Sequence, residues 1–151
     1  MYKYIISDTS CLILFDNIGE LDILRKTYGE ITTTPEVIQE YGRPIPDWIK
    51  QETVENKDKQ VEFEKLVDKG EASAIALALE SENSVLIIDD KRGRKLAREQ
   101  NIEITGTLGT ILKAKNMGVI SRIRPLVEKL KAANYRISTD IIEGILKRAG
   151  E

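Results

Sequence analysis

The sequence predicts an α/β fold built around a parallel β-sheet. Two short apolar runs rich in β-branched residues, at Ile5-Ile6 and at Val85–Ile88, are typical of buried strands. Such runs alternate with helical patterns along the chain, which indicates parallel strands joined by helices. An alanine-rich stretch at 72–80 is apolar all round and predicts a buried helix. With 151 residues, we expect one domain with its own core.

The N-terminal third is expected to continue this alternation. Thr34 followed by Pro35 is typical of a helix start, and Gly42 of a helix end. Trp48 and Ile49 are expected to pack back onto the domain, and the polar segment 51–60 is expected to be mobile or insertion-tolerant. The expected elements are helices at 11–18, 21–28 and 35–41, and a strand at 30–33.

The rest of the chain contains the strongest local patterns. Segment 61–67 is amphipathic, residues 68–70 break it, and Glu71 opens the alanine-rich helix. A helix is expected from Lys91 onward, where a basic cluster follows the second apolar strand. The remaining expected elements are strands at 102–105 and 135–137, and helices at 110–116, 120–133 and 140–149.

The composition excludes several kinds of site. The chain has no histidine and one cysteine, so Ser–His and Cys–His catalysis and an intramolecular disulfide are excluded. Cys11 lies in an apolar run and is expected to be buried. A zinc site of the usual nitrogen and sulfur type is also excluded. Any metal should therefore be a hard ion with oxygen ligands, such as Mg²⁺ or Mn²⁺.

Hydropathy and charge set further expectations. No apolar run approaches the roughly 20 residues of a membrane span, and the N-terminus lacks the pattern of a signal peptide. We therefore expect a cytoplasmic protein with no membrane partner. Residues 111–151 carry nine basic and four acidic residues, whereas residues 1–110 carry 14 basic and 21 acidic ones. This asymmetry is compatible with a polyanion-binding end.

Four acidic residues occupy equivalent positions at the ends of elements. Asp8 and Asp90 follow apolar strands, Glu40 lies on the helix after the second strand, and Glu71 begins a helix. In a parallel sheet these positions lie on one edge. Carboxylates brought together there repel and raise one another's pKa values, and a divalent cation removes that cost. For any one of these acids, a solvent-exposed surface position is the alternative.

Such a metal site, next to positive charge, suits a phosphodiester substrate. A divalent ion can activate water and hold a phosphodiester for in-line attack. Lys91, Arg92 and Arg94 follow the second strand and are candidates for binding the phosphates of the substrate.

The sequence resembles the PIN-domain family, in particular the branch common in archaea that includes toxin-type ribonucleases of toxin–antitoxin pairs. The matching passages occur in family order and cover nearly all of residues 1–115. They are Ile-Ile-Ser-Asp-Thr-Ser-Cys-Leu (5–12), Thr-Thr-Pro-Glu-Val-Ile-Gln-Glu (33–40), Lys-Gly-Glu-Ala-Ser-Ala-Ile-Ala-Leu-Ala (69–78), Leu-Ile-Ile-Asp-Asp-Lys-Arg-Gly-Arg-Lys-Leu-Ala (86–97) and Thr-Gly-Thr-Leu-Gly-Thr-Ile-Leu (105–112).

The resemblance implies a three-layer α/β/α fold with a small parallel sheet, and a Mg²⁺- or Mn²⁺-dependent endoribonuclease. It implies that Asp8 is a metal ligand, and that Ser10 or Thr9 orients either Asp8 or a metal-bound water. Glu40 would be the helix acid of the catalytic quartet. Glu71 stands where many relatives carry aspartate, so its longer side chain keeps the charge and shifts the metal.

Two positions remain open in this comparison. Asp90 aligns best with the last acid of the family, and Asp89 is its nearest competitor. Thr107 stands where the family often places a hydroxyl near the site, and a plain turn residue is an equally good interpretation.

The resemblance also implies RNA as the substrate, a separately encoded antitoxin protein as a partner, and a homodimer. All the catalytic acids fall within 1–115, and residues 119–151 form a basic helical extension of the same domain.

Other functions remain as alternatives. A PIN-like domain can bind RNA or a protein without cutting. A phosphatase-like or receiver-like protein is disfavoured, because Asp8-Thr9-Ser10 lacks the second aspartate of an Asp-x-Asp motif and no lone lysine follows a late strand.

Overall fold

A computed structural model describes residues 2 and 4–151, and those residues form one parallel sheet flanked by helices. The sheet has the strand order β3-β2-β1-β4-β5. Its strands are β1 (Tyr4–Ser7), β2 (Ile31–Thr33), β3 (Ile49–Gln51), β4 (Ser84–Ile87) and β5 (Ile104–Thr105). The helices are α1 (Thr9–Asn17), α2 (Asp22–Tyr28), α3 (Pro35–Tyr41), α4 (Lys57–Glu64), α5 (Lys69–Glu80), α6 (Lys91–Glu99), α7 (Thr107–Asn116), α8 (Arg124–Ala132) and α9 (Thr139–Arg148).

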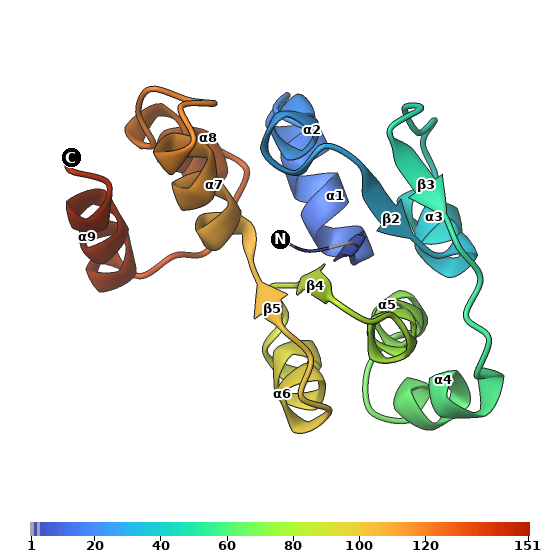
Figure 1. The fold of residues 1–151 in the computed structure, drawn as a ribbon. Coiled ribbons are helices and arrows are strands. Elements are labelled where there is room, and N and C mark those ends of the chain that lie inside the picture. Colours follow the sequence, from blue (N-terminus) through green and yellow to red (C-terminus); the bar gives the residue numbers. More distant parts are fainter. Residues whose placement is uncertain (1, 3) are drawn as a thin grey trace.

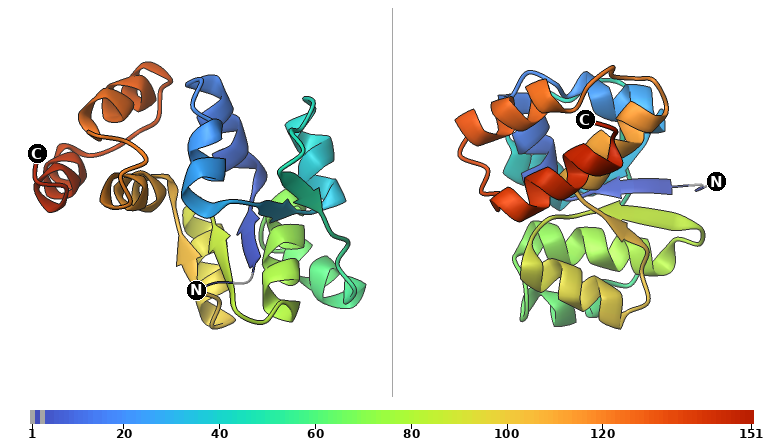
Figure 2. Two further views of the ribbon diagram at one scale, coloured as in Figure 1. Left: turned by 45° about the horizontal axis from the view of Figure 1, so that its top comes forward. Right: turned by 90° about the vertical axis from the view of Figure 1, so that its left-hand side faces the viewer.

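The elements form three layers, as the sequence predicts. Helices α1, α2 and α7 cover one face of the sheet, and α5 and α6 cover the other, with α4 packed on α5 (Figure 1, Figure 2). Helix α3 packs against both α1 and α5. Helices α8 and α9 lie beyond α7, at the end of the molecule opposite β3 and α4 (Figure 1). The predicted α/β/α architecture is therefore confirmed.

The core explains why β1 and β4 were the clearest strands in the sequence. Ile6 pairs with Leu86 in the sheet, and both side chains are fully buried. Helix α5 is buried from Gly70 to Ala78, because its alanines allow close packing against the sheet. The C-terminal helices α8 and α9 add Leu130 and Ile145 to the same core.

The order of the strands creates a switch point beside β1. From β1 the chain adds β2 and β3 on one side, and it then returns to add β4 and β5 on the other. In open parallel sheets, ligands bind outside the carboxyl ends of the strands at such a point. Asp8 is the first residue after β1 and therefore lies at this position.

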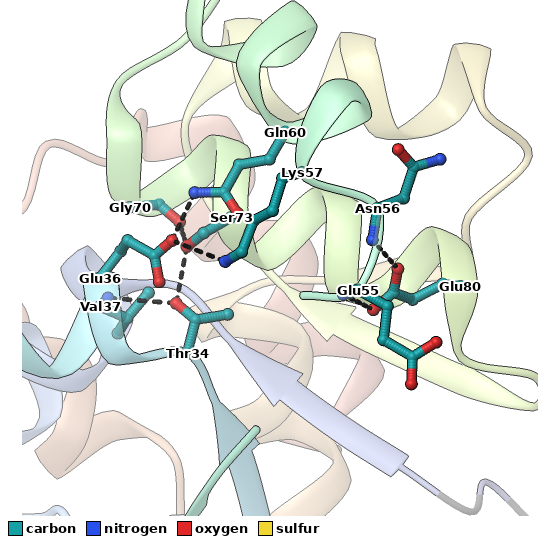
Figure 3. Close-up of polar contacts among 10 residues, drawn as sticks. All are labelled: Thr34, Glu36, Val37, Glu55, Asn56, Lys57, Gln60, Gly70, Ser73 and Glu80. Carbon is teal, nitrogen blue, oxygen red and sulfur yellow. Dashed lines mark hydrogen bonds and ion pairs between the residues drawn. The ribbon is translucent and has the colours of Figure 1, made fainter. Parts of the chain in front are cut away.

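The segment predicted to be mobile, 51–60, is instead anchored. It contains the end of edge strand β3 and the first turn of α4, which begins at Lys57 and ends before the predicted residue 67. Glu80 at the end of α5 accepts hydrogen bonds from the backbone N–H groups of Glu55 and Asn56, at 2.8 and 3.1 Å (Figure 3). The Asn56 side chain then caps α4. The polar groups of this segment thus serve in hydrogen bonds to α5 and in capping α4.

Several helices begin earlier than predicted, among them α1 at Thr9 instead of residue 11. Helix α5 begins at Lys69, since the Asp68 side chain caps it, and the residues 68–70 start the helix rather than only breaking the previous one. Helix α7 begins at Thr107 rather than at residue 110. Residues 135–137, predicted as a strand, belong to the connection between α8 and α9. Among the described residues, no helix is long and apolar enough to cross a membrane.

Candidate active site

Asp8 lies at the carboxyl end of β1 and caps helix α1. Its side chain is fully buried, and Oδ1 accepts a hydrogen bond from the N–H of Cys11 at 3.0 Å. The other oxygen, Oδ2, is buried and has no hydrogen-bond partner among the described residues. Burial raises the pKa of Asp8 to about 7, against the effect of the bond from Cys11, and the nearby negative charges of Asp89 and Asp68 add to the rise.

Glu71 is a second buried carboxyl group at the same edge. It lies in the first turn of α5, and its Oε1 is buried without a partner in the part of the chain that the structure describes. Its pKa is raised to about 9, mainly by burial and further by interactions with Asp68 and Asp90. In the ion-free protein, Glu71 therefore holds a proton at neutral pH.

Glu40 approaches this edge from the last turn of α3. Its Oε1 accepts a hydrogen bond from the Thr9 hydroxyl at 2.7 Å, and its Oε2 accepts one from the N–H of Gly70 at 3.1 Å. A side chain at position 70 would collide with both Glu40 and Thr9. The glycine of the Lys-Gly-Glu passage thus gives Glu40 access to the amino end of α5, where the helix dipole favours negative charge.

Hydrogen bonds also join the first turn of α3 to α4 and α5 (Figure 3). The hydroxyls of Thr34 and Ser73 are 2.6 Å apart, and Ser73 donates to the carbonyl of Gly70. Glu36, one turn before Glu40, instead accepts a hydrogen bond from Gln60 on α4. The two glutamates of α3 therefore have different surroundings, with Glu36 bound to α4 and Glu40 bound to α1 and α5.

The two aspartates after β4 also differ. Asp89 accepts hydrogen bonds from the N–H of Thr107 at 2.9 Å and from its hydroxyl at 2.6 Å, and the Cys11 thiol lies 3.5 Å from Oδ2. Asp90 is exposed and caps α6 by accepting from the N–H of Gly93 at 2.9 Å. Thr107 is fully buried, and its N–H and hydroxyl both donate to the Asp89 carboxylate.

Two further glycines make room for the acids. A Cβ atom at Gly93 would lie 2.7 Å from Oε1 of Glu71 and 2.6 Å from Cδ1 of Ile88. A Cβ atom at Gly106 would lie 2.5 Å from Oδ1 of Asp89. The backbone is therefore shaped around the carboxylates at the carboxyl edge of the sheet.

The predicted substrate-binding residues lie on the first turn of α6. Lys91 and Arg92 are exposed, whereas Arg94 is half-buried and donates from Nη1 to the carbonyl of Ile88 at 2.9 Å. Ser10 is exposed in the first turn of α1. The bond that orients Asp8 comes from Cys11, and the neighbouring hydroxyl of Thr9 orients Glu40.

Sequence reasoning missed two residues of this region. Asp68 caps α5 and adds negative charge near Asp8 and Glu71. Its position three residues before Glu71 is typical of a helix-capping aspartate, so the sequence could have revealed it. Tyr135 is near enough to Asp89 and Thr107 for both to influence its pKa. No local pattern pointed to Tyr135, since it comes from the connection between α8 and α9.

The side chains at this edge have the type of donor atom that a hard divalent cation prefers. They offer oxygen atoms only, and the buried oxygens Oδ2 of Asp8 and Oε1 of Glu71 lack partners that a cation would supply. Within residues 2 and 4–151, no three acidic or thiol side chains converge closely enough to form a preassembled ion site. Any ion bound here would therefore draw these side chains closer together and displace their protons.

Comparison with known families gives one match. The DUF3368 family model, described as a PIN domain, matches residues 4–151. No curated protein and no solved structure matches the chain significantly.

Proposed function

This chain belongs to the PIN-domain family, and on that premise we propose that it is a divalent-metal-dependent endoribonuclease. PIN domains are generally nucleases and typically use divalent metals. The observation that carries the proposal is the pair of buried carboxylate oxygens without partners, on Asp8 and Glu71. Burying such groups is unfavourable unless they serve a ligand, because an unpaired carboxyl oxygen loses its hydration without replacement.

We assign the residues as follows. Asp8, Glu71 and Asp90 would hold Mg²⁺ or Mn²⁺, with Asp89 as the competitor of Asp90. A bound ion of this kind supplies an activated water and neutralises charge on the phosphodiester. Glu40 is exposed and is fixed by bonds to both oxygens. It completes the catalytic quartet, as the acid that can accept a proton from water on its open side.

The supporting residues act on these acids and on the substrate. Thr107 holds Asp89 through two hydrogen bonds, so this carboxylate stays oriented as the substrate binds. Ser10, exposed beside Asp8, is assigned to a water at the site. Lys91, Arg92 and Arg94 would bind the phosphates of RNA. The Arg94 donors beyond the one bonded to Ile88 would serve this purpose.

The resemblance to toxin-type ribonucleases supports three finer proposals. These are a role as the toxin of a toxin–antitoxin pair, an antitoxin protein that covers the acidic edge, and a homodimer. The basic helical extension, residues 119–151, offers a surface for either RNA or a partner.

One observation favours a second candidate function, a catalytically silent PIN-like module that binds RNA or a protein. No three potential ligands are preassembled among the described residues. In this alternative the acids would stay protonated or solvated, and the domain would bind without cutting.

Cleavage of labelled single-stranded and structured RNAs distinguishes the two functions. The reactions contain Mn²⁺, Mg²⁺ or EDTA, and compare the wild type with Asp8→Asn, Asp90→Asn and the matched control Asp47→Asn, an exposed acid away from the site. The nuclease requires metal-dependent cutting that both site variants lose and the control keeps. RNA binding by the wild type without cutting would establish the silent module instead.

A further inference from the structure

The connection between α8 and α9 brings an aromatic side chain to the acidic edge. Tyr135 lies 46 positions after Asp89, and its side chain is near enough to Asp89 and Thr107 for both to influence its pKa. Burial and the charge of Asp89 raise the pKa of Tyr135, so its phenol stays neutral. The ring is half-buried against the core. Tyr135 therefore joins the acidic edge to the C-terminal extension.

The backbone holds this connection at both ends. The N–H of Tyr135 donates to the carbonyl of Leu130 at 2.9 Å, directly after Asn134 turns the chain with a φ of 63°. At the other end, the Ser138 hydroxyl accepts from the N–H of Ile141 at 3.2 Å and caps α9. The segment is therefore positioned before any ligand arrives, which lowers the entropy cost of binding.

Tyr135 also lines an open surface depression of about 650 Å³. Its other lining residues are Lys131, Asn134, Arg136, Ile137 and Ser138. Lys131 and Arg136 are exposed, so the depression has two cations beside an aromatic ring. This combination suits single-stranded nucleic acid, because the bases stack on the ring while the cations contact the phosphates.

We propose that residues 131–138 form a binding groove for single-stranded RNA next to the acidic edge. Tyr135 stacks on one unpaired base, and Lys131 and Arg136 contact the flanking phosphates. The backbone bond from Tyr135 to Leu130 and the packing of the ring against the core hold the ring in place. A base held there lies beside the carboxylates, so the groove would choose which phosphodiester is presented. This role for the groove rests on the proposed nuclease function.

Binding of a labelled single-stranded RNA, measured by fluorescence anisotropy in EDTA, tests the groove without requiring catalysis. We expect Tyr135→Ala to raise Kd about tenfold, since loss of a base–aromatic stack costs that much, and Tyr135→Phe to stay within about twofold. The double variant Lys131→Ala/Arg136→Ala should reduce the slope of log Kd against log salt by about 1.4, for two lost contacts to a single strand. The charge-matched control is Lys50→Ala/Lys65→Ala, which removes two exposed lysines from β3 and the end of α4.

The groove is refuted if the wild type does not bind single-stranded RNA at low salt, or if Tyr135→Ala binds like the wild type. If Tyr135→Ala fails to fold, the variant Lys131→Ala/Arg136→Ala tests the groove instead, since both of its side chains are exposed. The groove is then refuted if the slope of log Kd against log salt equals that of the control. Cleavage in Mn²⁺ separates this proposal from the nuclease. Cutting with an unchanged KM in Tyr135→Ala keeps the nuclease and rejects the groove. Tyr135-dependent binding without cutting keeps the groove and rejects the nuclease.

Discussion

Replacing Asp8 with asparagine should stabilise the metal-free protein at alkaline pH. Folding raises the pKa of Asp8 from 3.8 to about 7, so the folded state binds its proton more tightly than the unfolded chain does. Stability from this group is therefore lost as the pH rises through that interval. At pH 8 the charged form costs about 4 kcal/mol, from a shift of about three units at 1.36 kcal/mol each.

Asparagine removes this cost and keeps the cap. Its side-chain oxygen can still accept from the N–H of Cys11, and its amide carries no charge for Asp89 and Asp68 to repel. The amide N–H at the position of Oδ2 lacks an acceptor, which costs about 1 to 2 kcal/mol. The net gain is about 2 kcal/mol at pH 8. It falls to about zero near pH 5, because the pH there is only about one unit above the unfolded pKa of 3.8 and keeping Asp8 protonated costs correspondingly little.

Urea unfolding of the wild type and of Asp8→Asn, in EDTA from pH 5 to pH 8.5, measures this difference. Asp47→Asn serves as the control and should change stability by less than about 0.5 kcal/mol. Adding Mn²⁺ should reverse the order of the two proteins, because the ion stabilises only the form that binds it. A variant that is less stable than the wild type at pH 8 in EDTA would refute the reasoning.

Three other predictions concern the same edge and its supports. Folding raises the pKa of Glu71 from 4.5 to about 9, so the wild type should lose unfolding free energy as the pH rises through that range in EDTA. Glu71→Gln should reduce this loss, and urea titrations that show the same pH dependence in both proteins would contradict the prediction. Gly70→Ala should reduce RNA cleavage at least tenfold by displacing Glu40. The control Gly144→Ala on α9, where a Cβ meets open space, should add about 0.5 to 1 kcal/mol of stability and keep activity. Equal cleavage by the two variants would argue against the role of Glu40. Glu80→Ala should cost about 1 to 3 kcal/mol in thermal unfolding and leave cleavage unchanged, and a loss of cleavage by the folded variant would show that the anchoring of α4 matters to the site.

The sequence predicted the central part of the fold because burial there leaves a clear pattern. Strands β1 and β4 are covered on both faces, so they contain consecutive apolar residues, Ile5-Ile6 and Val85–Ile87, without alternation. Edge strand β3 was missed because only Ile49 in it is buried, while Lys50 and Gln51 are exposed. The start of α7 was predicted late because Gly109 looked like part of a turn, although it gives space to the Thr105 hydroxyl within the helix.

The candidate site was predictable where it depends on element ends. Asp8, Glu71 and the aspartates after β4 follow from the rule that parallel strands end on one edge. The division of roles between Glu36 and Glu40 depends on what α4 and α1 offer to each side chain, and no spacing shows that. The position of Tyr135 depends on how α8 and α9 pack beyond α7, which a single sequence does not show.

The most direct test of the central claim is calorimetric titration of the metal-free protein with Mn²⁺ at pH 8, in buffers of different ionisation enthalpy. If the acidic edge is the ion site, Mn²⁺ should displace roughly one proton per ion, mostly from Glu71, whose pKa is about 9. Asp8→Asn should weaken the binding at least tenfold, and Asp47→Asn should leave it unchanged. Binding without proton release and unaffected by Asp8→Asn would contradict the assignment of the ion to this edge.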